Sequence, residues 1–198
     1  LKKLKEEIEY ARLENSPEIW DTRSYSFQLW NIETTYTHIL KQTDLTEAWK
    51  RIDPEVQKAI DSAEQKFTFR EDEKYEYLQR FVKLSGGGDI LQKRIDWLRS
   101  RDLCRLYVVA DRTGTMFGMT LTILSRENST VYLWGSMCDD SKLENEVFPY
   151  LFWKSYEVLA DEFPCMDLGG SGKFSVGLIK DKLGCEPTPR FITTHGKK

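Results

Sequence analysis

Residues 129–191 decide the fold: STVYLWGSMCDDSKLENEVFPYLFWKSYEVLADEFPCMDLGGSGKFSVGLIKDKLGCEPTPRF. The first nine residues are β-branched and aromatic, which favours a strand over 129–137. A helix is expected over 146–162. The apolar run CMDLGG, closed by glycines, then predicts a buried strand over 165–169. A strand–helix–strand unit of this length predicts two neighbouring parallel strands joined by a right-handed crossover.

Pro149 constrains where the crossover helix begins. Proline is tolerated in the first turn, where amides have no intrahelical partner, so the sequence favours a start at Asn145 as N-cap. The alternative is a capping box of Ser141 with Glu144, which would place Pro149 deeper and force a kink. The late start puts several side chains on one inward face: Phe148, Phe152, Ser155, Leu159 and Phe163, with Leu151 and Val158 beside it.

Upstream of this unit, hydrophobic periodicity predicts further helices and strands. Helices are expected over 1–14, over 45–60 with an interruption at Pro54, over 72–84 and over 89–99. Strands are expected over 24–30, 34–40, 66–70, 103–110 and 115–124. Asp44 is the expected N-cap of the helix that follows it. The predicted fold class is α+β: a mixed, mainly antiparallel sheet with one parallel crossover pair, flanked by helices.

The glycine triplet at 86–88 does not have the setting of a phosphate-binding loop. No strand precedes it and no Gly-Lys-Ser/Thr follows it. We therefore interpret 85–88 as a mobile loop away from the functional site.

The segment 129–191 resembles the GNAT superfamily of N-acyltransferases, and among its branches the Fem-type, peptidoglycan-bridge aminoacyltransferases. The resemblance is carried by Pro149, by Asp167-Leu168-Gly169-Gly170, and by Ile179-Lys180-Asp181-Lys182-Leu183-Gly184, which follows the branch's F-K-x-x-F-G-like pattern. VQKAIDSAEQKFTFRED (56–72) is similar to the branch's helix-then-strand segment. The resemblance extends over 45–191. It implies a GNAT-like fold and transfer of an acyl group from an activated donor to an amine.

The chain departs from the superfamily at the start of the crossover helix. Acetyl-CoA-binding members carry Q/R-x-x-G-x-G/A there, whereas this chain has DDSKLENEVFPY (139–150). Its four acids would repel a pyrophosphate at close range. Acyl-CoA stays a candidate donor, with Asn145, Gly169 and Gly170 as expected cofactor contacts. The Fem-type branch also lacks the glycine loop and uses aminoacyl-tRNA. That donor favours a broad basic surface, and the net charge of −3 disfavours it.

The resemblance and the expected topology together place the working site between the ends of the two parallel strands. Acyl transfer to an amine needs a base, a stabilised oxyanion and a protonated leaving group. Catalytic roles are predicted for Asp167, with Asp139 or Asp140 as alternative bases, and for Lys180, as a stabilising charge. Substrate contacts are predicted for Trp134, Gly135, Ser136 and Lys173. The structural alternatives are a turn-capping carboxylate for Asp167 and an exposed surface lysine, of little consequence for stability, for Lys180.

Composition bounds the remaining possibilities. A chain of 198 residues suits a single domain over 1–198, with 1–43 as the candidate edge of a larger or duplicated unit. Four scattered cysteines and two distant histidines predict reduced thiols, a cytoplasmic location and no metal site. No apolar run has the length of a membrane span, so no membrane partner is expected. The expected acceptor is a small-molecule or peptide amine.

Two further features keep alternatives open. Basic residues cluster over 93–105, which suits either a phosphate site or a solvated face: Lys93, Arg94, Arg99, Arg101 and Arg105.

A third functional hypothesis stands beside transfer from acyl-CoA and transfer from aminoacyl-tRNA. It is a non-catalytic GNAT-like domain that binds a ligand or partner, in which a side chain such as Phe174 fills the gap between the strands.

Overall fold

The computed structural model of the protein describes residues 9–19, 21–41, 44–139, 141, 143–170 and 174–196, the side chains of 174 and 175 excepted. In chain order the elements are β1 (Ala11–Glu14), α2 (Arg23–Ser26), β2 (Asn31–Lys41), α3 (Leu45–Arg51), α4 (Pro54–Lys66), β3 (Phe67–Glu71), α5 (Leu78–Ser85), α6 (Gly88–Arg99), β4 (Cys104–Asp111), β5 (Met116–Ser125), β6 (Thr130–Cys138), α7 (Glu144–Leu159), β7 (Cys165–Asp167), α8 (Phe174–Lys182) and β8 (Glu186–His195).

The strands form one mixed sheet in the order β1-β8-β2-β7-β6-β5-β4-β3. β6 and β7 run parallel, and every other neighbouring pair in this sheet is antiparallel. α7 connects β6 to β7. The predicted α+β class and the predicted parallel crossover pair are therefore confirmed, although β7 ends at Asp167, two residues earlier than expected.

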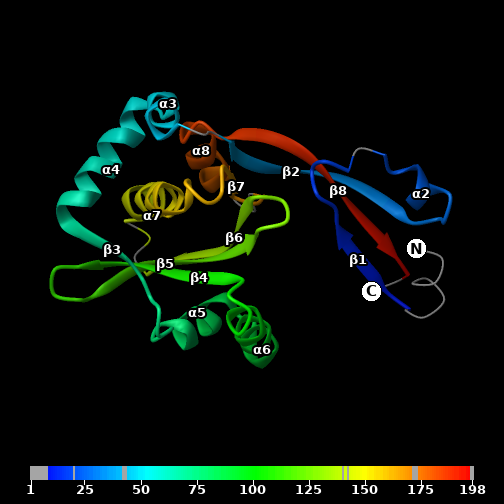
Figure 1. The fold of residues 1–198 in the computed structure, drawn as a ribbon, viewed down its shortest axis with the longest axis horizontal. Coiled ribbons are helices and arrows are strands. Elements are labelled where there is room, and N and C mark those ends of the chain that lie inside the picture. The colour runs from blue at the N-terminus through cyan, green and yellow to red at the C-terminus, as the bar shows by residue number, and fades with distance from the viewer. Residues whose placement is uncertain are drawn as a thin grey trace.

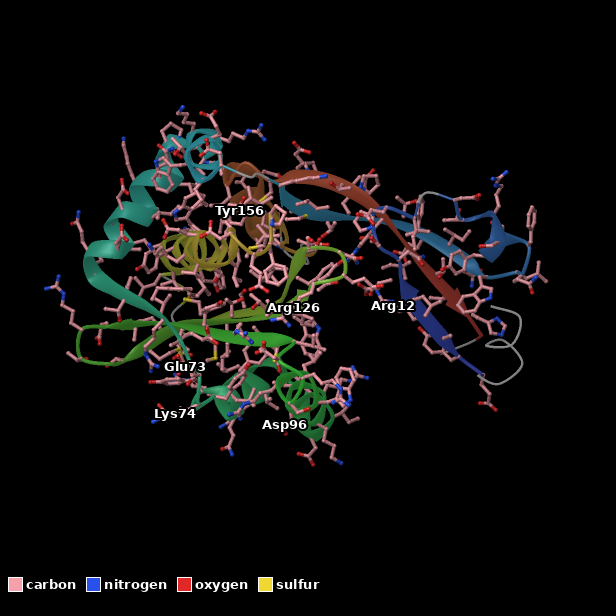
Figure 2. All side chains as sticks on the ribbon, in the orientation of Figure 1. Arg12, Glu73, Lys74, Asp96, Arg126 and Tyr156 are labelled. Carbon is pink, nitrogen blue, oxygen red and sulfur yellow. The ribbon has the colours of Figure 1, made fainter. Side chains whose placement is uncertain are left out.

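Helices cover both faces of the sheet (Figure 1). On one face, α3, α4 and α7 bury a large apolar cluster that includes Ile60, Leu151, Tyr156 and Phe163. On the other face, α5 and α6 cover β4 and β5 through a second cluster that includes Phe81, Ile95 and Leu106. Figure 2 shows Tyr156 in the first layer and Asp96 of α6 at the outer edge of the second. The far ends of β2 and β8, with β1 and α2, extend away from this body (Figure 1).

Local sequence signals place the boundary between α3 and α4 where it was expected. Asp44 caps α3 by accepting a hydrogen bond from Thr46 N at 2.8 Å. Pro54 separates α3 from α4 and occupies the first turn of α4, where its missing N–H costs nothing. Asp53 caps α4 by accepting from Glu55 N at 2.8 Å. The predicted interruption at Pro54 is thus confirmed.

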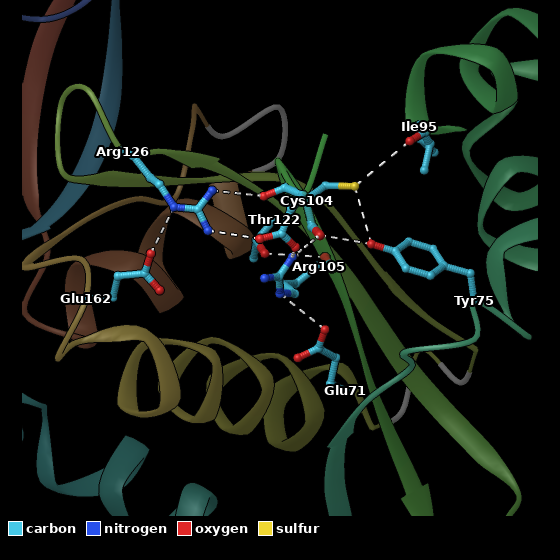
Figure 3. Close-up of polar contacts among 9 residues, drawn as sticks. Glu71, Tyr75, Ile95, Cys104, Arg105, Thr122, Arg126 and Glu162 are labelled. Atoms are coloured by element: carbon cyan, nitrogen blue, oxygen red, sulfur yellow. Dashed lines mark hydrogen bonds and ion pairs between the residues drawn. The ribbon is translucent and has the colours of Figure 1, made fainter. Parts of the chain in front are cut away.

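The helix predicted over 72–84 begins only at Leu78, because Asp72 organises the preceding segment differently. Its side chain is buried and accepts from Tyr77 N at 2.8 Å, while its own N–H donates to Leu106 O at 2.7 Å. Tyr75 adopts a positive φ of 57° and donates its hydroxyl to Cys104 O at 2.9 Å. The turn over 72–77 is therefore held by β4 (Figure 3).

Figure 3 also shows an ion-pair network at the start of β4. Arg105 contacts Glu71 at 3.3 Å and Asp102 at 2.6 Å. Arg126 contacts Asp102 at 3.0 Å and Glu162 at 3.2 Å. The Arg105 and Arg126 guanidiniums hold the pKa of Asp102 below its usual range. The network joins the end of β3 to the turns after β5 and α7.

Two N-terminal predictions are wrong. Residues 11–14, expected to be helical, form β1 because the edge of β8 supplies backbone partners, such as Thr194 for Arg12; residues 1–8 of that predicted helix lie outside the described residues. The strand expected over 24–30 is instead the short helix α2 followed by a turn. The side chains of Phe27 and Leu29 are 79% and 82% exposed, so no sheet face stabilises an extended conformation there.

Neither predicted start of the crossover helix is right. The N-cap of α7 is Leu143, whose carbonyl accepts from Val147 N at 2.8 Å. Pro149 therefore lies inside the helix and leaves the carbonyl of Asn145 without an i+4 donor. The Pro149 side chain is buried, and packing offsets the missing hydrogen bond. The predicted inward face is buried as expected, except for Val158, which is 53% exposed.

Candidate active site

A cleft opens where the two parallel strands separate. β6 pairs with β7 only over Thr130–Tyr132 against Cys165–Asp167. Beyond this point β7 ends, whereas β6 continues to Cys138. The cavity at the separation has a volume of about 430 Å³. Backbone groups of β6 that would pair with a longer β7 therefore border the cleft, where an extended ligand can meet them.

Seven of the residues predicted from the sequence line this cleft: Trp134, Gly135, Ser136, Asp167, Gly169, Gly170 and Lys180. Phe148 and Phe152 of α7, Val176 of α8, and Glu14 and Arg190 complete much of the wall. The structure brings the predicted residues into one place. Whether they act in catalysis stays a prediction.

A β-bulge on β6 places Trp134 at the cleft. Leu121 of β5 lies opposite Gly135, and the next residue, Thr122, lies opposite Leu133. Trp134 is therefore the extra residue, and its side chain is 40% exposed. Bulges interrupt the ladder and redirect side chains, and they are frequent beside active sites. On the opposite side, a Cβ at Gly135 would lie 3.1 Å from the Phe81 ring, so α5 packs directly against the bulged segment.

Lys180 is buried, which contradicts the expectation of an exposed lysine. Its side chain is 3% exposed, and Nζ donates to the carbonyls of Leu168, Gly169 and Gly170 at 2.7, 3.2 and 2.8 Å. An ammonium has three protons, so these three acceptors use all of them. Burial lowers the pKa of Lys180 to about 8, with Asp167 acting in the opposite direction. The ammonium fixes the turn after β7 and places a positive charge at the cleft wall.

Asp167 combines the turn-capping role with a place in the cleft wall. It is 3% exposed, and its Oδ1 accepts from Gly169 N at 2.7 Å and from the hydroxyl of Thr37 on β2. No hydrogen bond to Oδ2 is found among the described residues. Gly169, at a φ of 71°, supplies the left-handed conformation that this turn requires. The sequence alternative of a turn carboxylate is thus realised, and Asp167 also lines the cleft.

Three residues near this turn and the cleft were not singled out by the sequence: Glu14, His38 and Arg190. His38 is buried; its Nε2 lies 3.2 Å from Asp181 Oδ1 and its Nδ1 lies 3.4 Å from Gly169 O. At the cleft itself, Arg190 Nη2 lies 3.2 Å from Glu14 Oε2. The Nε atom of Arg190 is buried without a hydrogen-bond partner within the described chain. These residues come from β1, β2 and β8, whose local sequences carry no signal of a site; only the long-range sheet pairing brings them here.

The remaining predicted site residues are not assembled at the cleft. Asn145, predicted as a cofactor contact, lies in the first turn of α7 and is not among the residues lining the cavity. Asp139, an alternative base, is paired with Arg80 and also does not line it. Lys173 and Asp140 lie outside the described residues, as does the side chain of Phe174.

The start of α7 is poorly suited to a pyrophosphate. Its first turn carries Glu144 and Glu146, and the N-cap makes no side-chain hydrogen bond. Glu146 is paired with Lys66 at 2.8 Å. Elsewhere in the described part of the chain, no three His, Cys, Asp or Glu side chains gather in a way that could hold a metal ion. None of the helices described there combines the length and the apolarity that a membrane span requires.

Solved structures share this fold at low sequence identity. FemX aligns with a TM-score of 0.63 and 11% identity over 79% of this chain and 61% of its own. The C-terminal domain of a putative lysylphosphatidylglycerol synthetase from Agrobacterium fabrum gives 0.62 and 10% over 89% and 65%. L-PGS from Bacillus licheniformis gives 0.58 and 11% over 90% and 65%.

The chain spans less than two thirds of each of these structures. No family model matches it, and no curated protein matches it significantly. The likeness shows the fold alone: the chain shares the fold of FemX, of the lysylphosphatidylglycerol synthetase domain and of L-PGS, in keeping with the resemblance to the Fem-type branch.

Proposed function

We propose that the protein transfers an acyl group from an activated donor to an amine in the cleft between β6 and β7. The observation that carries the proposal is the early end of the β6–β7 ladder at Tyr132 and Asp167. It leaves β6 backbone bordering a cavity that also holds a buried ammonium and a buried carboxylate. An extended acyl donor can pair with β6 while its carbonyl carbon lies near these charges.

Each charged group has a role in this reaction. The amine must lose a proton before it attacks the acyl carbon, and Asp167 Oδ2 is the base that we assign. The bond from carbon to nitrogen forms as the bond from carbon to the leaving oxygen or sulfur breaks, and the leaving atom then takes up a proton. Negative charge develops on the carbonyl oxygen during this step. The positive charge of Lys180 stabilises this negative charge electrostatically, while its three hydrogen bonds hold the turn beside the cleft.

Two donor classes follow from different observations. An acyl thioester such as acyl-CoA suits an extended arm paired with β6, although its pyrophosphate would meet Glu144 and Glu146. An aminoacyl ester on tRNA needs no pyrophosphate site, and the sequence resemblance of 129–191 to the Fem-type branch favours it. The net charge of −3 weighs against a large polyanion. We place the acyl thioester first and the aminoacyl ester second.

The test combines binding with turnover. The protein is incubated with acyl-CoA esters or with aminoacyl-tRNA, together with a panel of primary amines, and product is measured alongside the melting temperature. A donor that binds only the native state raises the melting temperature. Product from one donor class identifies the reaction, whereas neither product nor a melting shift with any donor would contradict the proposal and favour a non-catalytic binding domain.

Asp167→Asn is the sharpest variant. Asparagine keeps an oxygen to accept from Gly169 N and Thr37 but cannot take up a proton, so turnover should fall roughly 10²–10⁴-fold with little change in melting temperature. Asp161→Asn, in the exposed turn that follows α7, is the matched control and should retain full turnover. Full activity of Asp167→Asn would remove Asp167 as the base.

A further inference from the structure

The outer face of α6 presents apolar side chains that the fold does not need. Ile90 is 67% exposed and Trp97 is 53% exposed. They are seven residues apart, so they lie within about 20° of each other around the helix. The inward face of α6 packs on the sheet through Leu91, Ile95 and Leu98. Leu84, in the last turn of α5 just before α6 begins, is also exposed, at 49%.

Cations flank this apolar stripe on both sides. Lys93 and Arg94 follow Ile90 by three and four residues, which places them beside Ile90 and Trp97 along the helix. The Arg101 guanidinium lies 4.2 Å from the centre of the Trp97 ring. We call Ile90, Lys93, Arg94, Trp97 and Arg101 the α6 outer surface. All five side chains are exposed, and Figure 2 shows α6 at the edge of the molecule.

The positive charge of this surface is not neutralised locally. Lys93, Arg94 and Arg101 form no ion pair with the described residues, whereas Arg105 of the same basic segment pairs with Glu71 and Asp102. The two acids of α6, Asp89 and Asp96, lie four residues before and three residues after Lys93, so they are its neighbours on the helix, although no ion pair joins them to it among the described residues. Helical geometry places both acids more than 100° from Arg94. Three cations without an ion pair to the described residues thus gather on this surface, and two of them, Arg94 and Arg101, are also remote from the acids of α6.

We propose that the α6 outer surface docks the protein on an anionic lipid bilayer. Trp97 suits the headgroup level of a membrane, Ile90 can enter the acyl boundary, and the three cations complement anionic headgroups. Each such cation near an anionic surface contributes about 1 kcal/mol. A nucleic acid would use the cations and the indole but has no use for exposed Ile90 and Leu84. The sequence expectation of no membrane partner rested on the lack of a spanning segment, which does not bear on surface docking.

The test is co-sedimentation with vesicles of phosphatidylcholine, with or without an equal amount of phosphatidylglycerol. Wild-type protein should bind only the anionic vesicles, and added salt should release it. Ile90→Gln with Trp97→Gln should lower the partition coefficient at least tenfold, since burying either side chain is worth about 1.5–3 kcal/mol. Lys93→Gln and Arg94→Gln should each lower it about fivefold, which corresponds to about 1 kcal/mol.

Matched controls lie on the other helical layer. Val158→Gln replaces an aliphatic side chain of α7 that is 53% exposed, and Lys58→Gln replaces an exposed lysine of α4. Both should bind as the wild type does, and all variants should melt as the wild type does because the substituted side chains are exposed. The proposal is overturned if wild type ignores anionic vesicles, or if the α6 variants and the controls bind equally. It is also overturned if a structured RNA binds through Arg94 without dependence on Ile90, which would assign the surface to nucleic acid.

Discussion

Lys180 shows how one residue can join packing to chemistry. Its ammonium is surrounded by three carbonyls of the turn that closes the cleft, so its removal leaves three buried acceptors unpaired. Lys180→Met should therefore lower the free energy of unfolding by about 3 kcal/mol at neutral pH, measured by denaturant titration. Lys182→Met is the control: its Nζ contacts the exposed Glu55, so its loss should change stability far less than the loss of Lys180 does. Equal stability of both variants would contradict the buried role.

The pH dependence of that difference follows from the lowered pKa. Between pH 8 and pH 10.5 the unfolded chain keeps the Lys180 proton while the native state loses it, so native stability rises with pH. The gap in unfolding free energy between wild type and Lys180→Met should be constant below pH 7 and widen through this window by up to about 3 kcal/mol. Titrating groups that do not interact with Lys180 cancel in the comparison. A gap that stays flat to pH 10.5 would show that the ammonium is not desolvated.

The burial of Lys180 could not be foreseen from its own neighbours in sequence. Lysine at a helix end is ordinarily exposed, and α8 is too short to reveal an inward face. The pattern D-L-G-G followed by a helix indicated a turn near the cleft, but not that its carbonyls surround an ammonium. Lys180 lines the cleft and its catalytic role stays a prediction, whereas its expected exposure was wrong.

At the scale of elements, the packing of α7 on β5 depends on Gly118. A Cβ at this position would lie 2.4 Å from Val147 Cγ1, closer than atoms can approach. Gly118→Ala should destabilise the protein by about 1–3 kcal/mol through overpacking. Adding Val147→Ala creates room for the new methyl group, so the double variant should be more stable than the two single losses predict. Additive losses in denaturant titrations would mean that the contact does not limit the approach of α7.

Elements with local signals were predicted well, and those fixed by distant partners were not. Asp44, Asp53 and Pro54 act within a few residues, so the boundary between α3 and α4 could be read from the sequence. β1 is a strand only because β8 lies beside it, and the turn at Asp72 replaces a helix only because β4 supplies Leu106 O. The start of α7 was misplaced because burial of Pro149 outweighs its lost hydrogen bond.

Across the whole molecule, stability should be unevenly distributed. β4 and β5 lie between two helical layers, whereas the far ends of β2 and β8 and the whole of β1 lie outside both apolar clusters. Amides at 11–14 and 31–35 should therefore exchange with solvent at least about a hundredfold faster than those at 104–109, as measured by hydrogen exchange with mass spectrometry. All these amides lie in strands, so the comparison isolates tertiary packing. Uniform protection would indicate that the extension unfolds together with the body.

The central position of β2 has a consequence for biosynthesis. β2 ends at Lys41, and its partner β8 begins only at Glu186. At roughly 5–20 residues per second, a ribosome needs about 7–30 seconds to make the intervening chain. During that interval residues 31–38 of the nascent β2 have no strand with which to pair, since β7 pairs only with residues 39–41. Most of β2 is therefore a segment that needs shielding by a chaperone, and the synthesis of β8 ends that need.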